Sequence, residues 1–475
     1  MEENTIFQQE SSPKKETPQN RAVASEKSSP MQMRQQPLDS NENSGFPSAL
    51  IIKGILGLFF AAFVFFIVMQ FVLPKFKQTT KGTVNILYWG LWEDDNIMKG
   101  IIADFEKNNT NIKISYIKQD NKQYKNRVMT RIQNGSGPDI FLFHNTWLPQ
   151  MYTFLLPLPN DVMSKDEFQN FFYPVVINDL TRRGAIYGIP TNIDVLSLFI
   201  NTEIFTNAGV IPPTNWQEFA NTARLLTVKD ETGKIKTSGT AMGTFDNIIH
   251  APDIMSLLFA QNGANFSDLS QNQKSVVDAL DFYASFAKDE GKVWDTSLDP
   301  SIIAFAKGNV AMYFGYSWDI FAIKQLNPQF SFKVVSVPHL SGRAMTIASY
   351  WANGVSAKSK HQKEAMIFIK FLSQKDIMQK LFTEESKTRL FGELYPRKDL
   401  ADSLKDNQLV YPFISQANDA MSSFFASDTF DDGINSQMNA YLGNAVRSVL
   451  NGTSAETAVE TLTKGVAQVL GQYGQ

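Results

Sequence analysis

The stretch VNILYWGLWEDD, residues 84–95, decides the fold class of this chain. Its mostly apolar first half predicts a strand buried in a sheet, and its polar second half predicts the loop that follows. Further apolar strands are predicted at 112–117 and 139–143, and predicted helices at 95–107 and 122–134 separate the strands. Strands that alternate with helices of ten or more residues indicate βαβ units, so we expect an α/β fold with a parallel sheet.

Aromatic and polar residues collect where these predicted strands end. Trp92 and Glu93 follow the first strand, and Asn145 and Trp147 follow the third. In open sheets of this kind, ligands bind beyond the carboxyl ends of the strands. We therefore predict that these four residues contact a ligand. The alternatives are an exposed loop for the first pair and a packing contact at a helix start for the second.

A second stretch, FAKGNVAMYFGYSWDI at 305–320, contains an unbroken apolar run that predicts another buried strand. The run turns through Gly315 and ends in Trp318 and Asp319. A buried strand does not need a large flat ring beside an acid at its end. This pair is therefore a further candidate for contact with a ligand.

Three helix starts carry the spacing of a capping box. Thr214, Ser359 and Thr453 each precede a Gln or Glu by three residues. In this pattern the two side chains satisfy each other's free backbone donors at the start of the helix. The spacing therefore predicts these three residues as N-caps.

The composition excludes several classes of protein. None of the 475 residues is cysteine, which excludes disulfides, thiolate zinc sites, thiol nucleophiles and a lipid anchor on cysteine. The net charge of −3 argues against a phosphate-binding surface, so nucleic acid is not an expected partner. The sequence contains no G-x-S-x-G elbow, H-E-x-x-H pair or Walker loop, so we predict no catalytic residue, metal or cofactor. SDTFDDG at 427–433 begins like a calcium loop, but Phe430 stands where a ligand is needed.

The N-terminal part differs in composition from the rest. Residues 1–48 are rich in Gln, Ser, Pro, Glu and Asn, which predicts a disordered tail. Residues 54–73 carry no charge and are long enough to cross a bilayer, so we predict a transmembrane anchor at 49–73 and a linker at 74–82. A cleaved signal peptide is the alternative, but no small-x-small site follows the apolar stretch.

Six short segments stand in an order that matches one family of transport proteins. They are GSGPDI at 135–140, YGIP at 187–190 with LFINTEIF at 198–205, PPTNWQEF at 212–219, the stretch at 305–320, ANGVS at 352–356 and LNGTSAE at 450–456. Together they resemble the extracellular solute-binding proteins of ABC importers, in the sugar-binding group that is similar to maltose-binding protein. The resemblance covers the chain from about residue 83 to the end. The tail and the anchor depart from the family pattern.

The resemblance implies a two-lobed α/β fold of the periplasmic-binding-protein type II, with a ligand cleft between the lobes and one copy of the chain as the functional unit. The chain would cross between the lobes more than once. The implied boundaries are lobe 1 at about 83–199 and 343–395, lobe 2 at about 202–338 and 396–475, and crossings near 199–202 and 338–343.

The resemblance also implies a function and a location. The chain would capture a carbohydrate by hinge closure outside the cell and deliver it to the transmembrane permease subunits of an ABC importer, without catalysis. The linker at 74–82 would keep the lobes within about 30 Å of the membrane. The lysines that follow the anchor disagree with this orientation, because the positive-inside rule places them in the cytoplasm: Lys75, Lys77 and Lys81.

For the site, the resemblance implies that Trp318 stacks on the sugar. A sugar presents C–H faces that pack on rings and hydroxyls that donate and accept, so Asp319 is predicted as a hydroxyl acceptor. The alternative is that Trp318 closes the core of the second lobe. Asp194, just before the first crossing, and Trp351 and Asn353, in a region that faces the cleft in the family, are weaker candidates. A hydrogen bond that orders the hinge is the alternative for Asp194.

Other functions remain open at the level of the sequence. The same fold could bind a polyamine through the acidic residues at the predicted strand ends, which are Glu93, Asp94, Asp95, Asp194 and Asp319. Two facing carboxylates could also act as the acid and base of an anchored glycosidase. A ligand-sensing ectodomain is the third alternative, although the predicted tail contains no recognisable domain.

Overall fold

The computed structural model describes residues 64, 66, 67 and 82–475. Residues 82–475 lie in one compact unit. The predicted tail at 1–48 lies outside the described residues, and so does the predicted anchor at 49–73 apart from residues 64, 66 and 67. Within the described part of the chain, no helix is both long and apolar enough to cross a membrane.

The first sheet has five strands in the order β2-β1-β3-β14-β6. Strands β1 (Val84–Gly90), β2 (Ile112–Lys118) and β3 (Ile140–His144) are parallel, which confirms the three strands predicted from the sequence. Strand β14 (Trp351–Val355) runs antiparallel between β3 and β6 (Ile189–Pro190). A distant segment of the chain therefore completes this sheet.

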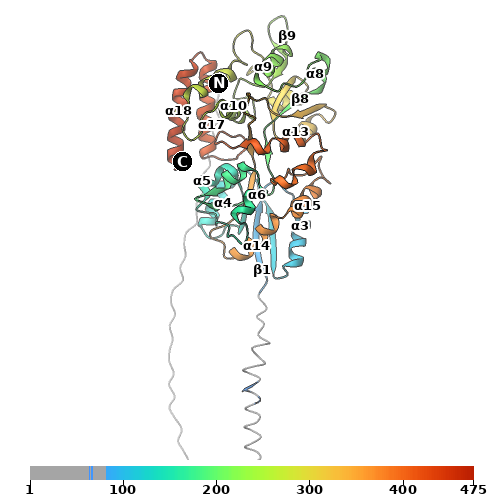
Figure 1. Ribbon diagram of the computed structural model, residues 1–475, viewed down its shortest axis with the longest axis vertical. Helices are drawn as coiled ribbons and strands as arrows, with labels where there is room; N and C mark the ends of the chain where they lie inside the picture. Colours follow the sequence, from blue (N-terminus) through green and yellow to red (C-terminus); the bar gives the residue numbers. More distant parts are fainter. Residues whose placement is uncertain (1–63, 65, 68–81) are drawn as a thin grey trace, which may run out of the picture. The chain divides into compact units, whose positions relative to one another are not determined.

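Helices cover the first sheet, in the lower part of the coloured ribbon in Figure 1. They include α3 (Asp95–Asn108), α4 (Tyr124–Gln133), α14 (Gln362–Leu372) and α15 (Lys375–Glu385). The first two confirm the predicted helices. Helix α3 buries Phe105 against Phe368 of α14, with ring centroids 4.9 Å apart.

The second sheet has five strands in the order β12-β8-β11-β10-β9. Strand β8 (Ser197–Asn201) is antiparallel to β11 (Val310–Gly315) and to β12 (Phe332–Val335). Strand β10 (Ile235–Thr240) is parallel to β11 and antiparallel to β9 (Val228–Lys229). Every residue of β11 is buried, because both faces of this sheet are covered.

Helices also cover the second sheet, in the upper half of Figure 1. They are α8 (Thr202–Ala208), α9 (Trp216–Leu225), α10 (Ala251–Asn262), α11 (Gln273–Ala284), α12 (Ser301–Ala306), α13 (Asp319–Leu326), α17 (Ile434–Leu450) and α18 (Ala455–Gln472). Helix α10 is almost entirely buried, and the last two helices pack on each other along one side of the molecule. This part of the chain therefore has a core of its own.

A small third sheet lies where the chain passes between the two large sheets. Its order is β15 (Ala420–Met421), β13 (Thr346–Ser349) and β7 (Asp194–Val195). The chain runs from β7 into the second sheet and from β13 into the first. Because β8 pairs only within the second sheet, the first crossing precedes Phe199. The residue boundaries of the two lobes, as inferred from the sequence, remain a prediction.

Shorter elements connect these parts. They are η2 (Asn145–Trp147), α5 (Leu148–Met151), α6 (Lys165–Phe171), α7 (Pro174–Leu180), β4 (Thr181–Arg182), β5 (Ala185–Ile186), η3 (Lys398–Leu404), α16 (Tyr411–Ser415) and η4 (Ala417–Asp419).

The three predicted N-caps are wrong. Helix α9 is capped by Asn215, whose side chain accepts from the amide of Glu218, and α18 is capped by Ser454. Helix α14 begins after His361, without a side-chain cap. In the first two cases, two adjacent residues are both able to cap, and the turn before the helix selects the second.

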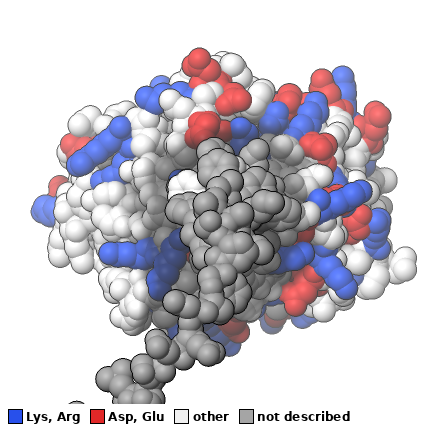
Figure 2. Space-filling view, turned by 90° about the horizontal axis from the view of Figure 1, so that it is seen from below, with Lys and Arg blue, Asp and Glu red and all other residues white. Residues whose placement is uncertain are grey.

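The face at the lower end of the molecule carries charges of both signs. Where it is not covered by grey atoms, Figure 2 shows lysine and arginine side chains interspersed with aspartate and glutamate. A mixed surface of this kind produces little long-range field of one sign.

Candidate functional site

The loop after β1 is held in place by the neighbouring strand β2. Gly90 ends β1 under the ring of Tyr116, which leaves no room for a Cβ atom. The Tyr116 hydroxyl donates to the carbonyl of Glu93 at 2.7 Å, and Lys118 donates to the carbonyl of Trp92 at 3.0 Å. These contacts fix the position from which the Trp92 side chain projects.

Three tryptophans meet at this end of the first sheet. The ring of Trp351 packs edge-on against Trp147, at 4.9 Å between centroids, and against Trp92, at 5.5 Å. Trp147 is fully buried and Trp351 is 7% exposed, whereas Trp92 is half-buried. Trp92 therefore offers a ring surface, and the other two support it from behind.

The Glu93 side chain points into the part of the molecule that is built on the first sheet. It is 6% exposed and faces a small space shared with Tyr88, Met98 and Thr191. Its Oε2 has no hydrogen-bond partner among the described residues. Burial, followed by the negative charge of Glu393, raises the pKa of Glu93 to about 7. The carboxyl group of Glu93 therefore changes its charge near neutral pH.

Trp318 lies at the equivalent place on the second sheet, between β11 and α13. Its ring stacks on that of Tyr316, with centroids 4.4 Å apart and planes inclined by 17°. Trp318 is half-buried, so part of the ring stays accessible. Each large sheet thus presents one tryptophan surface beyond the end of a buried strand.

The carboxylate of Asp319, the residue after Trp318, is hydrogen-bonded to other residues of the protein. Its Oδ2 is 2.8 Å from Nε2 of His250 and accepts from the Tyr313 hydroxyl and the Tyr316 amide, both at 3.0 Å. A Cβ atom on Gly315 would lie 2.4 Å from the same oxygen. The carboxylate therefore fixes the turn that carries Trp318.

Asp194 connects the first crossing to the same turn. Its Oδ2 accepts from the backbone amide of Ser317 at 2.8 Å and from the Ser317 hydroxyl. Burial raises the pKa of Asp194 well above its usual value, although these hydrogen bonds oppose the shift. This geometry corresponds to the hinge-ordering hydrogen bond that the sequence left open.

The two predicted amides lie in the interior. Asn145 donates to Asp179 at 2.8 Å, and its backbone pairs with that of Tyr350. Asn353 accepts from the Tyr88 hydroxyl at 2.6 Å within the first sheet. Both side chains are almost completely buried, so they serve to hold the strands that carry the tryptophans.

One aromatic residue near the site was not among the sequence candidates. Phe430 packs against Trp92, with ring centroids 5.9 Å apart, and its side chain is 40% exposed. Two residues earlier, Asp428 approaches His250 at 3.8 Å, and His250 in turn packs against Trp318. The segment around Phe430 therefore connects the two tryptophan surfaces. Its only signal in the sequence is a phenylalanine inside an acidic, loop-like run.

His250 carries the charge at this connection. Burial alone would lower its pKa, but the carboxylates of Asp319, Asp428 and Asp253 outweigh that effect and raise the pKa to about 9. The imidazolium form at neutral pH therefore holds three acidic side chains of different segments around it.

Of the nine sequence candidates, Trp92 and Trp318 keep an accessible ring, and the others are buried. The buried candidates are Glu93, Asn145, Trp147, Asp194, Asp319, Trp351 and Asn353. Burial depends on contacts from distant segments, for which a single sequence gives no direct signal.

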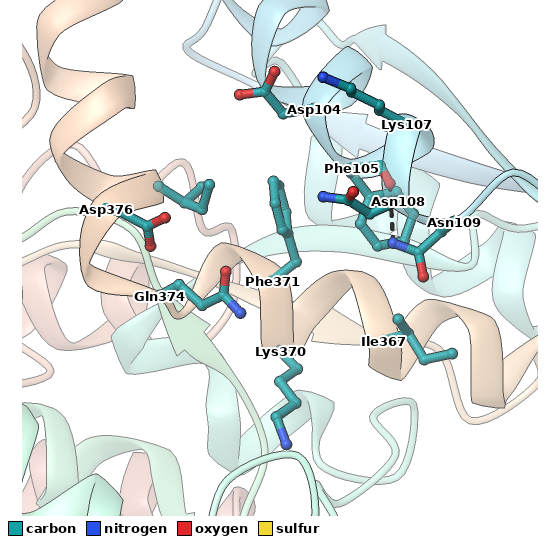
Figure 3. A pocket seen from close by; sticks show the side chains of 11 residues that line it. Asp104, Phe105, Lys107, Asn108, Asn109, Ile367, Lys370, Phe371, Gln374 and Asp376 are labelled. Carbon is teal, nitrogen blue, oxygen red and sulfur yellow. Dashed lines mark hydrogen bonds between the residues drawn. The ribbon is translucent and has the colours of Figure 1, made fainter.

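Two cavities of the described chain are lined by neither Trp92 nor Trp318. A groove of about 490 Å³ runs between the end of α3 and the helices α14 and α15 (Figure 3). Its lining includes Asp104, Lys107 and Phe371, and all of it comes from the first sheet's helices. A second pocket of about 340 Å³ is lined by Asp179 and Arg182 on one side and by Phe266 and segment 422–424 on the other. This second pocket lies between the parts built on the two sheets.

The arrangement of two covered sheets joined by crossing strands is that of a solute-binding protein. A family model described as "Bacterial extracellular solute-binding protein" matches residues 100–427. The chain belongs to this family. Trp92 and Phe430 both lie outside the matched range.

Relatives with similar sequences are also binding proteins by name. The multiple sugar-binding protein of Streptococcus mutans is 27% identical over 331 residues, which are 65% of this chain and 75% of that protein. A putative binding protein of Brucella abortus is 23% identical over 259 residues, which are 53% of this chain and 62% of that protein.

Solved structures share the fold. A cyclo/maltodextrin-binding protein complexed with maltotetraose superposes with a TM-score of 0.67 at 20% identity, covering 83% of this chain and 99% of that chain. The sugar-binding protein MalE from Xanthomonas citri superposes with a TM-score of 0.68 at 19% identity, covering 82% and 98%. The predicted two-lobed α/β solute-binding fold is confirmed by this likeness. The first lobe is built on the first sheet, and the second lobe on the second sheet.

Proposed function

We propose that this protein is the solute receptor of an ABC importer and that it captures a carbohydrate between its lobes. The observation that carries the proposal is the pair of half-buried rings, Trp92 and Trp318, one at a strand end of each lobe. Flat rings of this kind pack on the C–H faces of sugars. The Streptococcus mutans relative is a sugar-binding protein by name, and one of the similar structures is a complex with maltotetraose, which supports the same ligand class.

The mechanism that follows is lobe closure without chemistry. A ligand that touches both rings makes its full contacts only when the lobes are shut, so it stabilises the closed state by that difference in affinity. The crossing segments at β7 and β13 are the places where the motion would occur. The permease of the importer would then distinguish the closed shape from the open one.

The acidic residues favour a neutral ligand over a polyamine. Asp94 pairs with Lys118 at 2.6 Å, and Asp194 and Asp319 accept hydrogen bonds from the protein. Glu93 is buried with a raised pKa, which weakens its negative charge at neutral pH. Of the five acidic candidates, only Asp95, which is exposed in the first turn of α3, has no such assignment, so a pair of free carboxylates for glycoside hydrolysis has no support at these positions.

We further propose that residues 49–73 anchor the receptor in the membrane with the two lobes outside the cell. The support is the uncharged stretch at 54–73 and the family's description as extracellular. In intact cells, an added protease should cleave the lobes, and an alkaline wash of membranes should leave the chain bound. Release by the wash, or protection from the protease, would contradict this part of the proposal.

The binding function is tested by calorimetry on the full chain in detergent. A panel of neutral oligosaccharides should contain at least one ligand whose affinity is insensitive to salt, and spermidine serves as the comparison. Because only ion pairing is screened by salt, tight and salt-sensitive binding of spermidine alone would favour the polyamine reading.

The location of the site is tested by substitution. Trp92→Ala and Trp318→Ala should each weaken carbohydrate binding at least 10-fold. The matched variants are Phe266→Ala and Phe424→Ala, which change the pocket of about 340 Å³ between the lobes. If only the second pair weakens binding, the sugar binds in that pocket and the proposed ring pair is wrong.

A further inference from the structure

The segment 427–433, which we name the strap, is attached to both lobes. At one end, Ser427 lies 2.8 Å from Nδ1 of His250, on the second lobe. At the other end, Asp431 forms an ion pair with Lys125 of α4, and Asp432 accepts from Asn126 at 2.6 Å, on the first lobe. The acidic side chains that resemble a calcium loop thus have separate protein partners.

A buried ion pair fixes the end of the strap that is attached to the first lobe. The side chains of Lys125 and Asp431 are 4% and 0% exposed. Lys125 also donates to Gln150 at 2.6 Å, and Asp431 accepts from the amides of Gly433 and Asn435 at 2.8 Å. Burying two charges is costly unless such partners satisfy them, so this end of the strap has one strongly preferred position.

The backbone of the strap is strained at the residue that faces outward. Phe430 has a φ of 49° and Asp428 a φ of 52°, in the left-handed region. For a bulky residue this conformation is sterically unfavourable. The attachments on either side hold it, and they direct the Phe430 ring toward Trp92 and the solvent.

The exposure of Phe430 sets it apart from the other aromatic residues. Between residues 82 and 475, all of which the structure describes, it is the only Phe, Tyr or Trp that is exposed. A fold that buries or half-buries every other ring holds this one beside a proposed ligand surface. The ring extends the apolar face of Trp92.

We infer that Phe430 is a third ligand-contacting ring and that Asp431 is its positioning residue. The inference rests on the proposed function and adds to it a wall of the site that comes from the strap. A sugar on Trp92 would then touch an aromatic ring on a second side. The strap, of which only Ser427 lies within the family match, would so contribute to the choice of sugar.

The test uses the full chain and the carbohydrate found by calorimetry. Phe430→Ala should weaken binding about 3- to 10-fold, the range expected for one aromatic contact. Phe430→Tyr should retain the affinity and Phe430→Leu should not, because a leucine has the apolar area without the flat ring. Ile211→Ala, at a residue that is 83% exposed, is the control for a surface substitution.

The positioning role has a separate readout. Asp431→Asn should weaken binding in the wild-type background but have no further effect in the Phe430→Ala background, since residues that act together are not additive. Equal effects in both backgrounds would overturn this role. If the wild type binds carbohydrate and Phe430→Ala equals Ile211→Ala, the inference fails and the proposed function stands. If the wild type binds no carbohydrate, the proposed function fails first.

Discussion

Gly315 shows how closely one residue controls the turn that carries Trp318. A Cβ atom there would lie 2.4 Å from Oδ2 of Asp319 and 2.6 Å from the ring of Tyr313, and hydrogen bonds hold both groups. We expect Gly315→Ala to lower the free energy of unfolding by about 1–3 kcal/mol through overpacking. Urea denaturation measures the loss.

Gly291→Ala is the matched control for this change, because no atom lies within 4 Å of a Cβ atom at that position. It should change the free energy of unfolding by less than about 1 kcal/mol. Equal effects of the two substitutions would show that the packing around Gly315 adapts.

Glu93 predicts a dependence on pH at the residue scale. Its folded pKa of about 7 lies above the ordinary value of 4.5, so the folded protein holds this proton more tightly than the unfolded chain. The contribution to stability is therefore complete below about pH 4.5 and is lost as the pH rises through 7. Glu93→Gln should stabilise the protein relative to the wild type at pH 8, by at most about 3 kcal/mol, and much less at pH 5.

Thermal unfolding at the two pH values checks this expectation. Glu231→Gln, at an exposed loop residue, controls for the loss of one negative charge. A difference between Glu93→Gln and the wild type that stays constant from pH 5 to pH 8 would contradict the assignment.

At the residue scale, the type of side chain at the candidate site could be predicted from the sequence more readily than the exposure of that side chain to solvent. Tryptophans at strand ends could be found because a buried strand rarely needs such a ring. Whether the ring stays accessible depends on the neighbours that fold against it. Trp147 is covered by Trp351 from a segment about 200 residues away, whereas Trp318 rests on Tyr316 and His250 and stays half-buried.

At the scale of elements, helix α4 and the strap depend on each other. Lys125→Met would leave Asp431 buried without its cation, so we expect a loss of about 3–5 kcal/mol in the free energy of unfolding. Chemical denaturation followed by circular dichroism measures it.

Lys113→Met is the matched control on the same lobe. Lys113 pairs with Glu106 at 2.6 Å but is 52% exposed, so its loss should change stability by less than about 1 kcal/mol. Similar losses for both variants would mean that burial of the Lys125 pair has no special weight.

The boundaries of helices and strands could be predicted where each residue had only one possible role in the element. The helix at 95–107 and the strand at 139–143 agree with α3 and β3 to within about two residues, because their apolar periodicity is clear. The N-caps could not be predicted, because neighbouring pairs such as Thr214 and Asn215 offer two capping side chains. The role of the strap could not be predicted for another reason, because the residues that it contacts lie on two different lobes.

At the scale of the whole molecule, the shifted groups predict that stability declines from mildly acidic to alkaline pH. Burial raises the folded pKa of Asp179 to about 6, and burial with the charge of Glu393 raises that of Glu385 to about 8. The carboxylates around His250 outweigh its burial and raise its folded pKa to about 9. Each group binds its proton more tightly in the folded state, so each contribution is lost as the pH rises through that value. Two groups oppose this trend. Burial lowers the pKa of His144 to about 3, so its contribution to stability is lost as the pH falls from 6.5 toward 3. Hydrogen bonds, first of all from Thr232, lower the pKa of Asp230 to about 2, so its contribution is lost only at strongly acidic pH.

The melting temperature of the ligand-free chain should therefore be highest near about pH 5 and fall steadily toward about pH 9. Differential scanning fluorimetry across this range measures it. A maximum at pH 8 or above would show that other groups dominate the charge balance of the fold.

The two-lobed architecture was predictable from the order of the six family motifs. Local patterns alone indicated a parallel sheet and no more. They could not show that β14 runs between β3 and β6, since strand pairing is chosen by the completed core and by the crossings at β7 and β13.

The placement of β14 also has a consequence for how the chain is made. β3 ends at His144 and its neighbour begins at Trp351, about 200 residues later, so a ribosome needs roughly 10–40 s to supply the missing partner. During that interval the first lobe has an open edge and cannot lock into its final form. A receptor that we propose works outside the cell would therefore leave the ribosome, for most of its synthesis, with the first sheet incomplete.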